Sequence, residues 1–472
     1  MIPQAETIMK AAVCLALFAL TGCALTNPTD PYAPVPDGYP RAAMTSGPTP
    51  DYRAERSSRP LGLDECIRIA LENNPQIGAR SWDVEAAQAQ RDVTAAQRWP
   101  ALSAQGGYTR YDDNQRLVPA RVPNEPGAWS RGIASAGLVL SMPLFTGGQI
   151  INEVRAAELL SLAADRRLAR TRSELVFNVS STFYSILGQR RVIESLEFSR
   201  KALEQQRKRV QDLMAAQKAA KVDLLRTDVR LADLDQRILS EKNTLAIEQQ
   251  LLANLMGVRE DGAALTVQGD LALTPAPVEQ QATVEKALAQ RGDYLAARAE
   301  VEGQAKRVDA ARAERWPTLS LVGSFGGLWA AGDTTRQPGA SNSEDVGSAG
   351  LSLSVPLFEG GRIDADVRRE RANLAAAQEG LRGLELQIRL EVQTALLNVN
   401  SSLERVRATE KAIEQAQESL RIEQEKYELG KGSITDVLDA QSALLDSQTN
   451  YYRALADYDT ALAQLRLAVG EQ

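Results

Sequence analysis

The sequence predicts a mainly α-helical chain with a β portion that forms part of a membrane barrel shared between several copies. Three observations predict it: two very long helical stretches, two pairs of segments with alternating polarity, and an internal duplication that repeats both. Only 5% of the 472 residues are aromatic, which leaves few large rings to fill several compact cores. We therefore expect an elongated molecule.

The N-terminus has the features of an export signal. Lys10 precedes the apolar run Ala11–Leu20, which is too short to span a bilayer as a helix but has the length of a signal-peptide core. The acidic Glu6 ahead of this run is unusual in such signals and favours Met9 over Met1 as the natural start. We expect residues 1–22 to be removed.

A lipid attachment site is predicted directly after the signal. Leu20-Thr21-Gly22-Cys23 resembles a bacterial lipobox, in which the cysteine becomes the acylated first residue. The alternative is ordinary cleavage beside an incidental cysteine. Ala24, rather than Asp, in the next position fits transport to the outer membrane. We expect Cys23 to carry the lipid, and residues 23–60, which contain eight prolines, to form an extended tether.

The remainder of the chain consists of two copies of one unit, an internal duplication. Arg98-Trp99-Pro100 recurs as Arg315-Trp316-Pro317, an offset of 217 positions, and Pro143-Leu144-Phe145 recurs as Pro356-Leu357-Phe358, an offset of 213. This period is too long for a solenoid and indicates duplication of a whole helix-and-strand unit. The predicted domains are a first repeat over 61–267, a linker over 268–281 and a second repeat over 282–472.

Each repeat is predicted to contain an opening helix, two strands, a very long helix and a return helix. The expected opening helices, Leu63–Arg98 and Thr283–Arg315, each end before a proline. Each long helix follows a Gly-Gly pair and continues for about 66 residues, on the order of 100 Å. The expected return helices are Val222–Met256 and Ile434–Leu467, half as long, so that an opening and a return helix placed end to end can flank one long helix.

The second long helix has a coiled-coil repeat. Apolar residues recur every seven positions, with one step of eleven that lets the helices run straighter. The members are Val367, Leu374, Leu381, Ile388, Val399, Val406, Ile413, Leu420 and Tyr427. This spacing predicts helical hairpins that pack as coiled coils.

The predicted strands alternate apolar and polar residues. The apolar set is Leu102, Ala104, Gly106 and Tyr108, then Ala136, Leu138, Leu140 and Met142, and in the second repeat Leu319, Leu321, Gly323 and Phe325, then Ala349, Leu351, Leu353 and Val355. Four tryptophans in or beside these strands fit aromatic girdles at a bilayer interface: Trp99, Trp129, Trp316 and Trp329. The edge of a soluble sandwich is the alternative. Polar loops are expected at Asp112–Pro126 and Gly332–Asp345.

Four strands cannot close a membrane barrel, because open edges would leave backbone groups unpaired in lipid. Two, three or four copies would supply 8, 12 or 16 strands, and composition does not choose among them. The chain is therefore expected to share its barrel.

Composition argues against catalysis and nucleic-acid binding. The chain has no histidine, which removes the commonest general base and metal ligand, and its net charge is −7. We expect no enzymatic activity, no cofactor, no metal site and no nucleic-acid partner. A hydrolase using Asp436 and Asp439 is disfavoured because no cleft-forming domain accompanies them.

Together, the lipobox, Ala70-Leu71-Glu72-Asn73-Asn74-Pro75, both Pro-Leu-Phe segments and both hairpin tips resemble the TolC-like outer-membrane efflux protein family, lipoprotein branch. The resemblance covers essentially the whole mature chain. It implies a homotrimer with a 12-strand barrel in the outer membrane and a 12-helix periplasmic tunnel. It also implies docking to a periplasmic adaptor (a membrane fusion protein) and an inner-membrane transporter, and an exit duct that is passive.

The same resemblance assigns functional residues at the tips of the helical hairpins. Asp436 and Asp439 share one helix face and match a family segment that forms a periplasmic gate; by spacing alone, Ser433 and Asp436 read as a capping box. Carboxylate rings there would attract cations and disfavour anions.

A latch is also implied by the resemblance. Asp223 and Tyr427 match positions that hold the closed tip together through an arginine, but Gly432 stands at the arginine position. Lys431 or Lys221 is expected to take the arginine's role, or the latch is weaker. The alternative function is a non-conducting trimeric coiled-coil stalk or adhesin, which would need apolar seams that fill its axis.

Overall fold

A computed structural model describes residues 60–258, 265–271, 273 and 280–471. The predicted lipidation site Cys23, the predicted signal and the predicted tether up to residue 59 lie outside these ranges. The first repeat contains α3 Leu63–Asn73, α4 Pro75–Ala96, β1 Ala101–Arg116, β2 Ala128–Phe145, α5 Gln149–Ala215 and α6 Lys221–Leu255. The second contains α7 Gln280–Gln290, α8 Gly292–Ala313, β3 Thr318–Arg336, β4 Ser343–Ser354, α9 Arg362–Glu428 and α10 Ile434–Val469.

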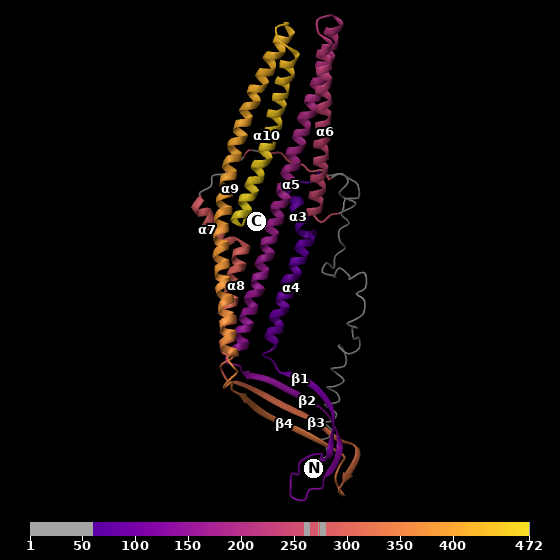
Figure 1. The fold of residues 1–472 in the computed structure, drawn as a ribbon, viewed down its shortest axis with the longest axis vertical. Helices are drawn as coiled ribbons and strands as arrows, with labels where there is room; N and C mark the ends of the chain where they lie inside the picture. The colour runs from indigo at the N-terminus through magenta and orange to yellow at the C-terminus, as the bar shows by residue number, and fades with distance from the viewer. Residues whose placement is uncertain (1–59, 259–264, 272, 274–279, 472) are drawn as a thin grey trace. The chain divides into compact units, whose positions relative to one another are not determined.

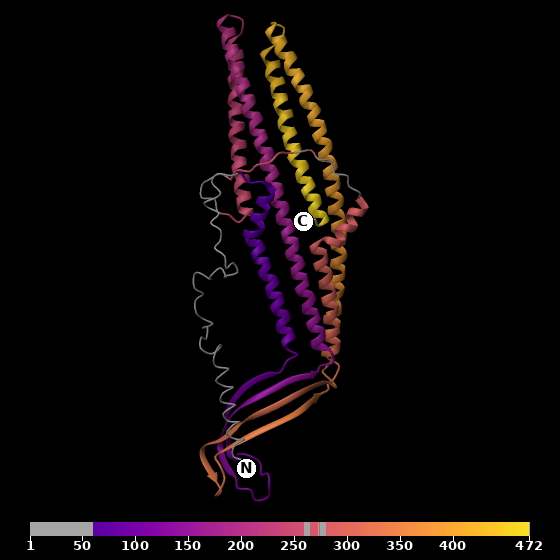
Figure 2. The same ribbon diagram turned by 180° about the vertical axis from the view of Figure 1, so that it is seen from behind.

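Helices and strands are segregated within residues 60–471. Figures 1 and 2 show the four strands as one sheet beyond the lower ends of the helices, and the hairpins α5–α6 and α9–α10 with their tips at the opposite end. α5 packs against α4, α6, α8 and α10, while α9 packs against α8 and α10. Each long helix is thus flanked along its length by an opening helix and a return helix, as the helix lengths predict.

The two long helices are confirmed. α5 and α9 have 67 residues each, and both follow a Gly-Gly pair whose four glycines have positive φ between 61° and 88°. The apolar residues that recur every seven positions along α9 are buried or half-buried. Val367, Ile388, Val399 and Val406 are the buried ones. None of the helices that the structure describes is both long and apolar enough to cross a bilayer.

The expectation of unbroken opening helices is wrong in both repeats. The first breaks at Asn74, whose ψ is 125°, because the ring of Pro75 disfavours helical backbone in the residue before it. Asn74 then caps α4 by accepting a hydrogen bond from the backbone of Gln76. The second breaks at Arg291, also with ψ 125°, where no proline follows. That break is held by tertiary contacts instead.

The four strands form one antiparallel sheet in the order β1-β2-β3-β4. They are longer than the alternation predicts: β1 extends to Arg116 and β3 to Arg336, while β4 already begins at Ser343. The polar loops are correspondingly shorter than expected, at residues 117–127 and 337–342. Because the extra strand residues are polar or small, alternation of apolar side chains could not reveal them.

The strand register confirms that the predicted apolar residues within the strands share one face; Val355 alone lies one residue beyond the end of β4. Leu102 pairs with Leu140, Leu140 with Gly323, and Gly323 with Ala349. The same rule places on this face Ala104, Tyr108, Ala136, Leu138, Met142, Leu319, Leu321, Phe325, Trp329, Leu351 and Leu353. The opposite face is more polar: it carries Ser103, Gln105, Thr109, Ser135, Ser141, Ser320, Ser324, Ser348 and Ser352, together with Ile133, Val139, Val322, Leu328 and Val346. An apolar face backed by a more polar one is the pattern of a membrane barrel.

Trp129 lies near the far end of β2, beyond a register irregularity between Ser130 and Gly132. It pairs with Arg116 of β1, whose guanidinium lies 5.5 Å from the centre of its ring. The other two tryptophans of the predicted girdles, Trp99 and Trp316, are exposed at the helix-proximal ends of β1 and β3.

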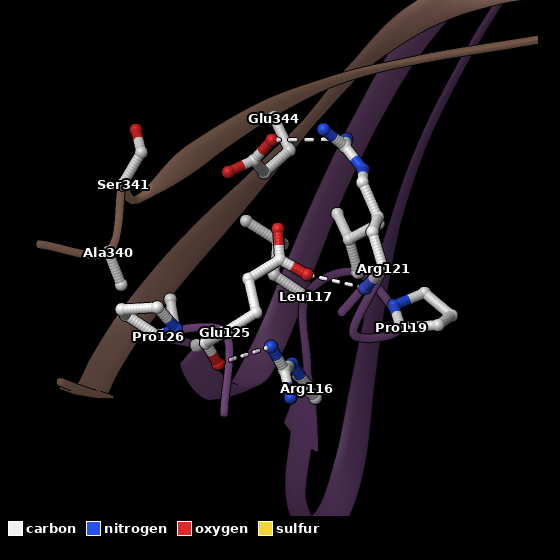
Figure 3. A pocket seen from close by; sticks show the side chains of 12 residues that line it. Arg116, Leu117, Pro119, Arg121, Glu125, Pro126, Ala340, Ser341 and Glu344 are labelled. Atoms are coloured by element: carbon white, nitrogen blue, oxygen red, sulfur yellow. Dashed lines mark hydrogen bonds and ion pairs between the residues drawn. The ribbon is translucent and has the colours of Figure 1, made fainter. Parts of the chain in front are cut away.

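The two loops at the far ends of the strands are tied together. Arg121 forms an ion pair of 3.5 Å with Glu344 at the start of β4, and its backbone amide donates to the Glu125 carboxylate (Figure 3). Gly127 and Gln337 also bond to each other, the amide of each donating to an oxygen of the other. These contacts make the two hairpin ends one unit.

Candidate functional site

The tips of α5–α6 and α9–α10 are built by the same turn. Gln217 and Gly430, 213 positions apart, both have positive φ, 61° and 70°. The next residue in each turn, Lys218 or Lys431, donates its backbone amide over 2.8 Å to a carbonyl of the last turn of the long helix. Such bonds satisfy carbonyls that a helix end would otherwise leave unpaired. The duplication therefore extends to the geometry of both tips.

Asp436 is fixed by a capping box. Its backbone amide donates to the Ser433 hydroxyl oxygen at 3.2 Å, while the Asp436 carboxylate accepts from the Ser433 amide at 3.2 Å and from the Ser433 hydroxyl at 2.9 Å. These hydrogen bonds lower the pKa of Asp436. The local role expected from spacing is thus present, and it keeps an exposed carboxylate charged at the tip.

Asp439 lies on the same exposed face, one turn further along α10. Its carboxylate accepts a hydrogen bond of 3.0 Å from Arg230 of α6, so that it links the two hairpins of one chain. The intervening Val437 and Leu438 are buried. The i, i+3 spacing therefore places both carboxylates where the sequence predicts, outside the packed core of the hairpin.

A ladder of contacts made by arginines of α6, absent from the sequence-based prediction, joins α6 to α10. Its three rungs are Arg226 to Thr435 at 2.8 Å, Arg230 to Asp439 at 3.0 Å, and Arg237 to Asp446 at 3.3 Å. All three join residues 209 positions apart. The constant separation of 209 positions is the only sign of these contacts in the sequence. It can be interpreted only when the two hairpins are known to lie side by side.

The predicted latch residues come close without bonding to each other. Tyr427 is half-buried, and burial together with the charge of Asp223 raises the pKa of its hydroxyl. Asp223 accepts a hydrogen bond of 3.2 Å from the amide of Ala220 at the start of α6. Within the described ranges, neither Lys221 nor Lys431 forms an ion pair, and arginines of α6 join the hairpins instead.

Gly432, at the position where the resemblance implies an arginine, is confined by its neighbours. A Cβ atom there would lie 3.0 Å from the Lys426 Cβ and 3.2 Å from the amide nitrogen of Tyr427. A side chain at this position would therefore need the long helix to give by a few tenths of an ångström. The turn is compatible with the absence of the arginine.

Comparison with known proteins gives consistent matches. The family model described as outer membrane efflux protein matches residues 66–258 and 283–471. The outer membrane protein TolC of Vibrio cholerae is 25% identical over 415 residues, which cover 86% of this chain and 90% of that protein. OprJ of Pseudomonas aeruginosa is 28% identical over 482 residues, covering 94% of each.

A solved structure has the same fold. The outer membrane protein VceC of Vibrio cholerae superposes with a TM-score of 0.75 at 21% identity, over 87% of this chain and 96% of VceC. The two segments that the family model matches contain both tips and all four strands.

Proposed function

We propose that this chain, which belongs to the outer membrane efflux protein family, assembles as a homotrimer into the outer-membrane duct of a tripartite efflux or secretion system. It is an outer-membrane channel protein with a helical extension into the periplasm. The proposal adds that an adaptor and an inner-membrane transporter open the hairpin tips, that the chain supplies no covalent chemistry, and that solutes pass through it without energy input.

The two-faced sheet with free edges is the observation that carries the proposal. Its apolar face suits lipid and its polar face suits a water-filled lumen. β1 and β4 each have a strand on one side only, among the strands that the structure describes. Unpaired edge groups are too costly in a bilayer for the sheet to remain open. Three copies supply the twelve strands that the family resemblance implies.

The outward faces of the helices support contact with further copies. Large apolar side chains are exposed along α9 and, at the other edge of the layer of helices, along α6; they are Leu386, Leu390 and Leu397, and Val229, Leu239 and Ile247. Apolar rows of this kind mark protein interfaces. The alternative of a filled stalk is not favoured, because the sheet presents a polar face that would have to be buried on the axis.

The tips are the proposed periplasmic gate. In a trimer Asp436 and Asp439 would each occur three times around the axis, and their charges would favour cations at the tunnel mouth. Asp223 and Tyr427 are proposed as latch residues, with Lys221 or Lys431 of a neighbouring copy as the cationic partner. The proximity of Asp223 to Tyr427 and the exposure of both lysines support this assignment.

Cys23 is proposed to anchor the mature N-terminus in the outer membrane. The lipobox and the proline-rich segment after it support this assignment. Metabolic labelling with a radioactive fatty acid checks it: label should enter the wild-type protein and not Cys23→Ser. Equal labelling of both proteins would rule out Cys23 as the attachment site.

Purified protein in a planar bilayer tests the duct and its gate together. We expect trimers by native mass spectrometry and an ion current that prefers cations. The double variant Asp436→Asn, Asp439→Asn should lower the cation preference several-fold, measured as a shift in reversal potential under a salt gradient. Asp446→Asn, on the same helix but further from the tip, is the control and should leave it unchanged. A stable monomer without current would refute the proposed function.

A further inference from the structure

The more polar face of the sheet carries almost no charge. The strands pair without a register shift over residues 101–110, 132–143, 318–331 and 343–354. Within these stretches, alternation places only one charged side chain on the more polar face, Glu344 of β4, whereas Arg110 and Asp345 fall on the apolar face. The more polar face lines the lumen of the proposed duct, and we call it the lumen face. Glu344 is its one fixed charge in these stretches.

Glu344 lies at the end of the lumen face that is farthest from the helices. It is the second residue of β4 and pairs with Leu328, which pairs with Ser135 and through it with Gly107. From this row of residues β4 runs toward α9 (Figure 1). A solute that enters from outside the cell therefore meets Glu344 before the uncharged part of the lumen face.

A loop from another part of the sheet brings a cation to Glu344. Arg121 belongs to residues 117–127, which join β1 to β2, and β3 lies between β2 and β4. Its guanidinium nevertheless lies 3.5 Å from the Glu344 carboxylate (Figure 3). Glu125 holds the loop in this shape, because its carboxylate accepts from the Arg121 amide and its carbonyl accepts from Arg116 at 2.9 Å. The loop thus carries its charge to the lumen face.

Both charged groups stay in contact with water. The Arg121 side chain is 62% exposed and that of Glu344 is 37% exposed. Exposed ion pairs are weak, because water screens both charges and the long side chains lose freedom when they pair. Ions and charged solutes at this end of the sheet therefore interact with each of the two charges, and the two effects oppose each other.

We propose that Glu344 and Arg121 together set the charge preference of the outer mouth of the duct. The carboxylate favours cationic solutes, and the guanidinium offsets it, so that the pair admits solutes of either sign. The inference rests on the proposed function, because it takes the more polar face to line a conducting lumen. It adds a second charged position, at the opposite end of the chain's long axis from Asp436 and Asp439.

Chemical labelling from outside the cell tests the proposal. Ser324→Cys places a reporter thiol on the lumen face of β3, four residues inward of Leu328, the partner of Glu344. Intact cells are treated in parallel with a cationic and an anionic methanethiosulfonate reagent at an ionic strength of about 10 mM, where charges act over about 30 Å. The ratio of the two labelling rates measures the charge of the mouth, and any change in the reactivity of the thiol itself cancels.

The two partners should shift this ratio in opposite directions. Glu344→Gln leaves Arg121 unpaired and should lower the cation-to-anion ratio about threefold, whereas Arg121→Gln leaves Glu344 unpaired and should raise it about as much. Glu344→Asp keeps the charge and should keep the ratio. Asp345→Asn is the matched control, because it removes the same charge from the neighbouring residue on the apolar face, and it should have no effect. In about 1 M salt, where charges act over about 3 Å, all variants should agree.

A second reporter checks which face lines the lumen. Phe325→Cys lies next to Ser324 on the apolar face and should be labelled much more slowly, because lipid covers it. The protein without an introduced cysteine controls for Cys66.

The outcomes separate the mouth from the duct. Opposite shifts by Glu344→Gln and Arg121→Gln, with Asp345→Asn unchanged, support the proposal. Unchanged ratios, shifts in one direction, or an equal shift by Asp345→Asn overturn it, as does labelling of Phe325→Cys in place of Ser324→Cys. If the trimer conducts, the proposed function stands whatever the labelling shows. A monomer without current refutes the proposed function, and the inference with it.

Discussion

Asn74 and Arg291 occupy equivalent positions in the two repeats. Each joins the break in the opening helix to the end of the return helix, Asn74 through an amide and Arg291 through a guanidinium. Both stand between the two opening helices with ψ at 125°. Asn74 donates its side-chain amide to the carbonyl of Leu255 at 2.8 Å, and Arg291 donates to that of Ala468 at 3.3 Å. These carbonyls lie in the last turns of α6 and α10. In each repeat, the break in the opening helix therefore caps the end of the return helix.

Substitution of Arg291 is expected to destabilise the protein more than substitution of Asn74. Arg291 is buried and also pairs with Asp293 and Glu391, both at 2.6 Å. Arg291→Met would strand these carboxylates and should lower the free energy of unfolding by about 3–5 kcal/mol. Asn74→Ala removes one buried hydrogen-bond donor and a cap, and should cost about 1–2 kcal/mol. Thermal unfolding in detergent compares them; an equal or smaller loss for Arg291→Met would contradict the assignment.

The ionised carboxylate of Asp459, in α10, is expected to destabilise the protein at neutral and higher pH. Burial raises its pKa from 3.8 to about 6, although the charge of Arg466 opposes the shift. A raised pKa in the folded state means that stability falls as pH rises from about 4 to about 6 and stays lower above it. Asp459→Asn should therefore stabilise the protein at pH 8 by about 1–2 kcal/mol, after discounting for partial solvent exposure, and by much less near pH 4.

The matched control for this carboxylate is two residues away. Asp457 is exposed and pairs with Arg405 at 2.9 Å, so Asp457→Asn removes the same charge without relieving burial. It should change the free energy of unfolding by less than about 1 kcal/mol. Melting temperatures of both variants across pH 4–8 give the comparison. A stabilisation by Asp459→Asn that does not depend on pH would show that burial of the charge is not its cause.

The latch predicts that Asp223→Ala increases resting conductance. The substitution removes a charge beside Tyr427 and one hydrogen bond at the start of α6, so the closed tip should be less well held. Asp228→Ala is the control, because its partner Arg207 belongs to the same hairpin and the pair does not span the gap to α10. Single-channel recording without adaptor measures the effect. Unchanged conductance in Asp223→Ala would remove Asp223 from the latch.

The sequence predicts those features that depend on local pattern. The Gly-Gly pairs and the long stretches without proline after them locate α5 and α9 to within a few residues, and alternation assigns the predicted apolar residues to one face of the sheet. The break at Arg291 is not predictable from its neighbours, since no proline enforces it and partners up to 177 positions away hold it. The contact of Arg230 with Asp439 likewise depends on how two hairpins lie against each other, which neither helix alone determines.

Gly432 offers a direct test of how the tip closes without the arginine that the resemblance implies there. Gly432→Arg would supply a cation beside Tyr427, and it should lower resting conductance if charge pairing limits closure. The added Cβ lies 3.0 Å from that of Lys426, so the turn must also adjust. Gly432→Ala imposes the same crowding without the charge, and it should leave resting conductance unchanged or raise it. A rise in both variants would mean that the fit of the turn, rather than the missing cation, determines how firmly this tip closes.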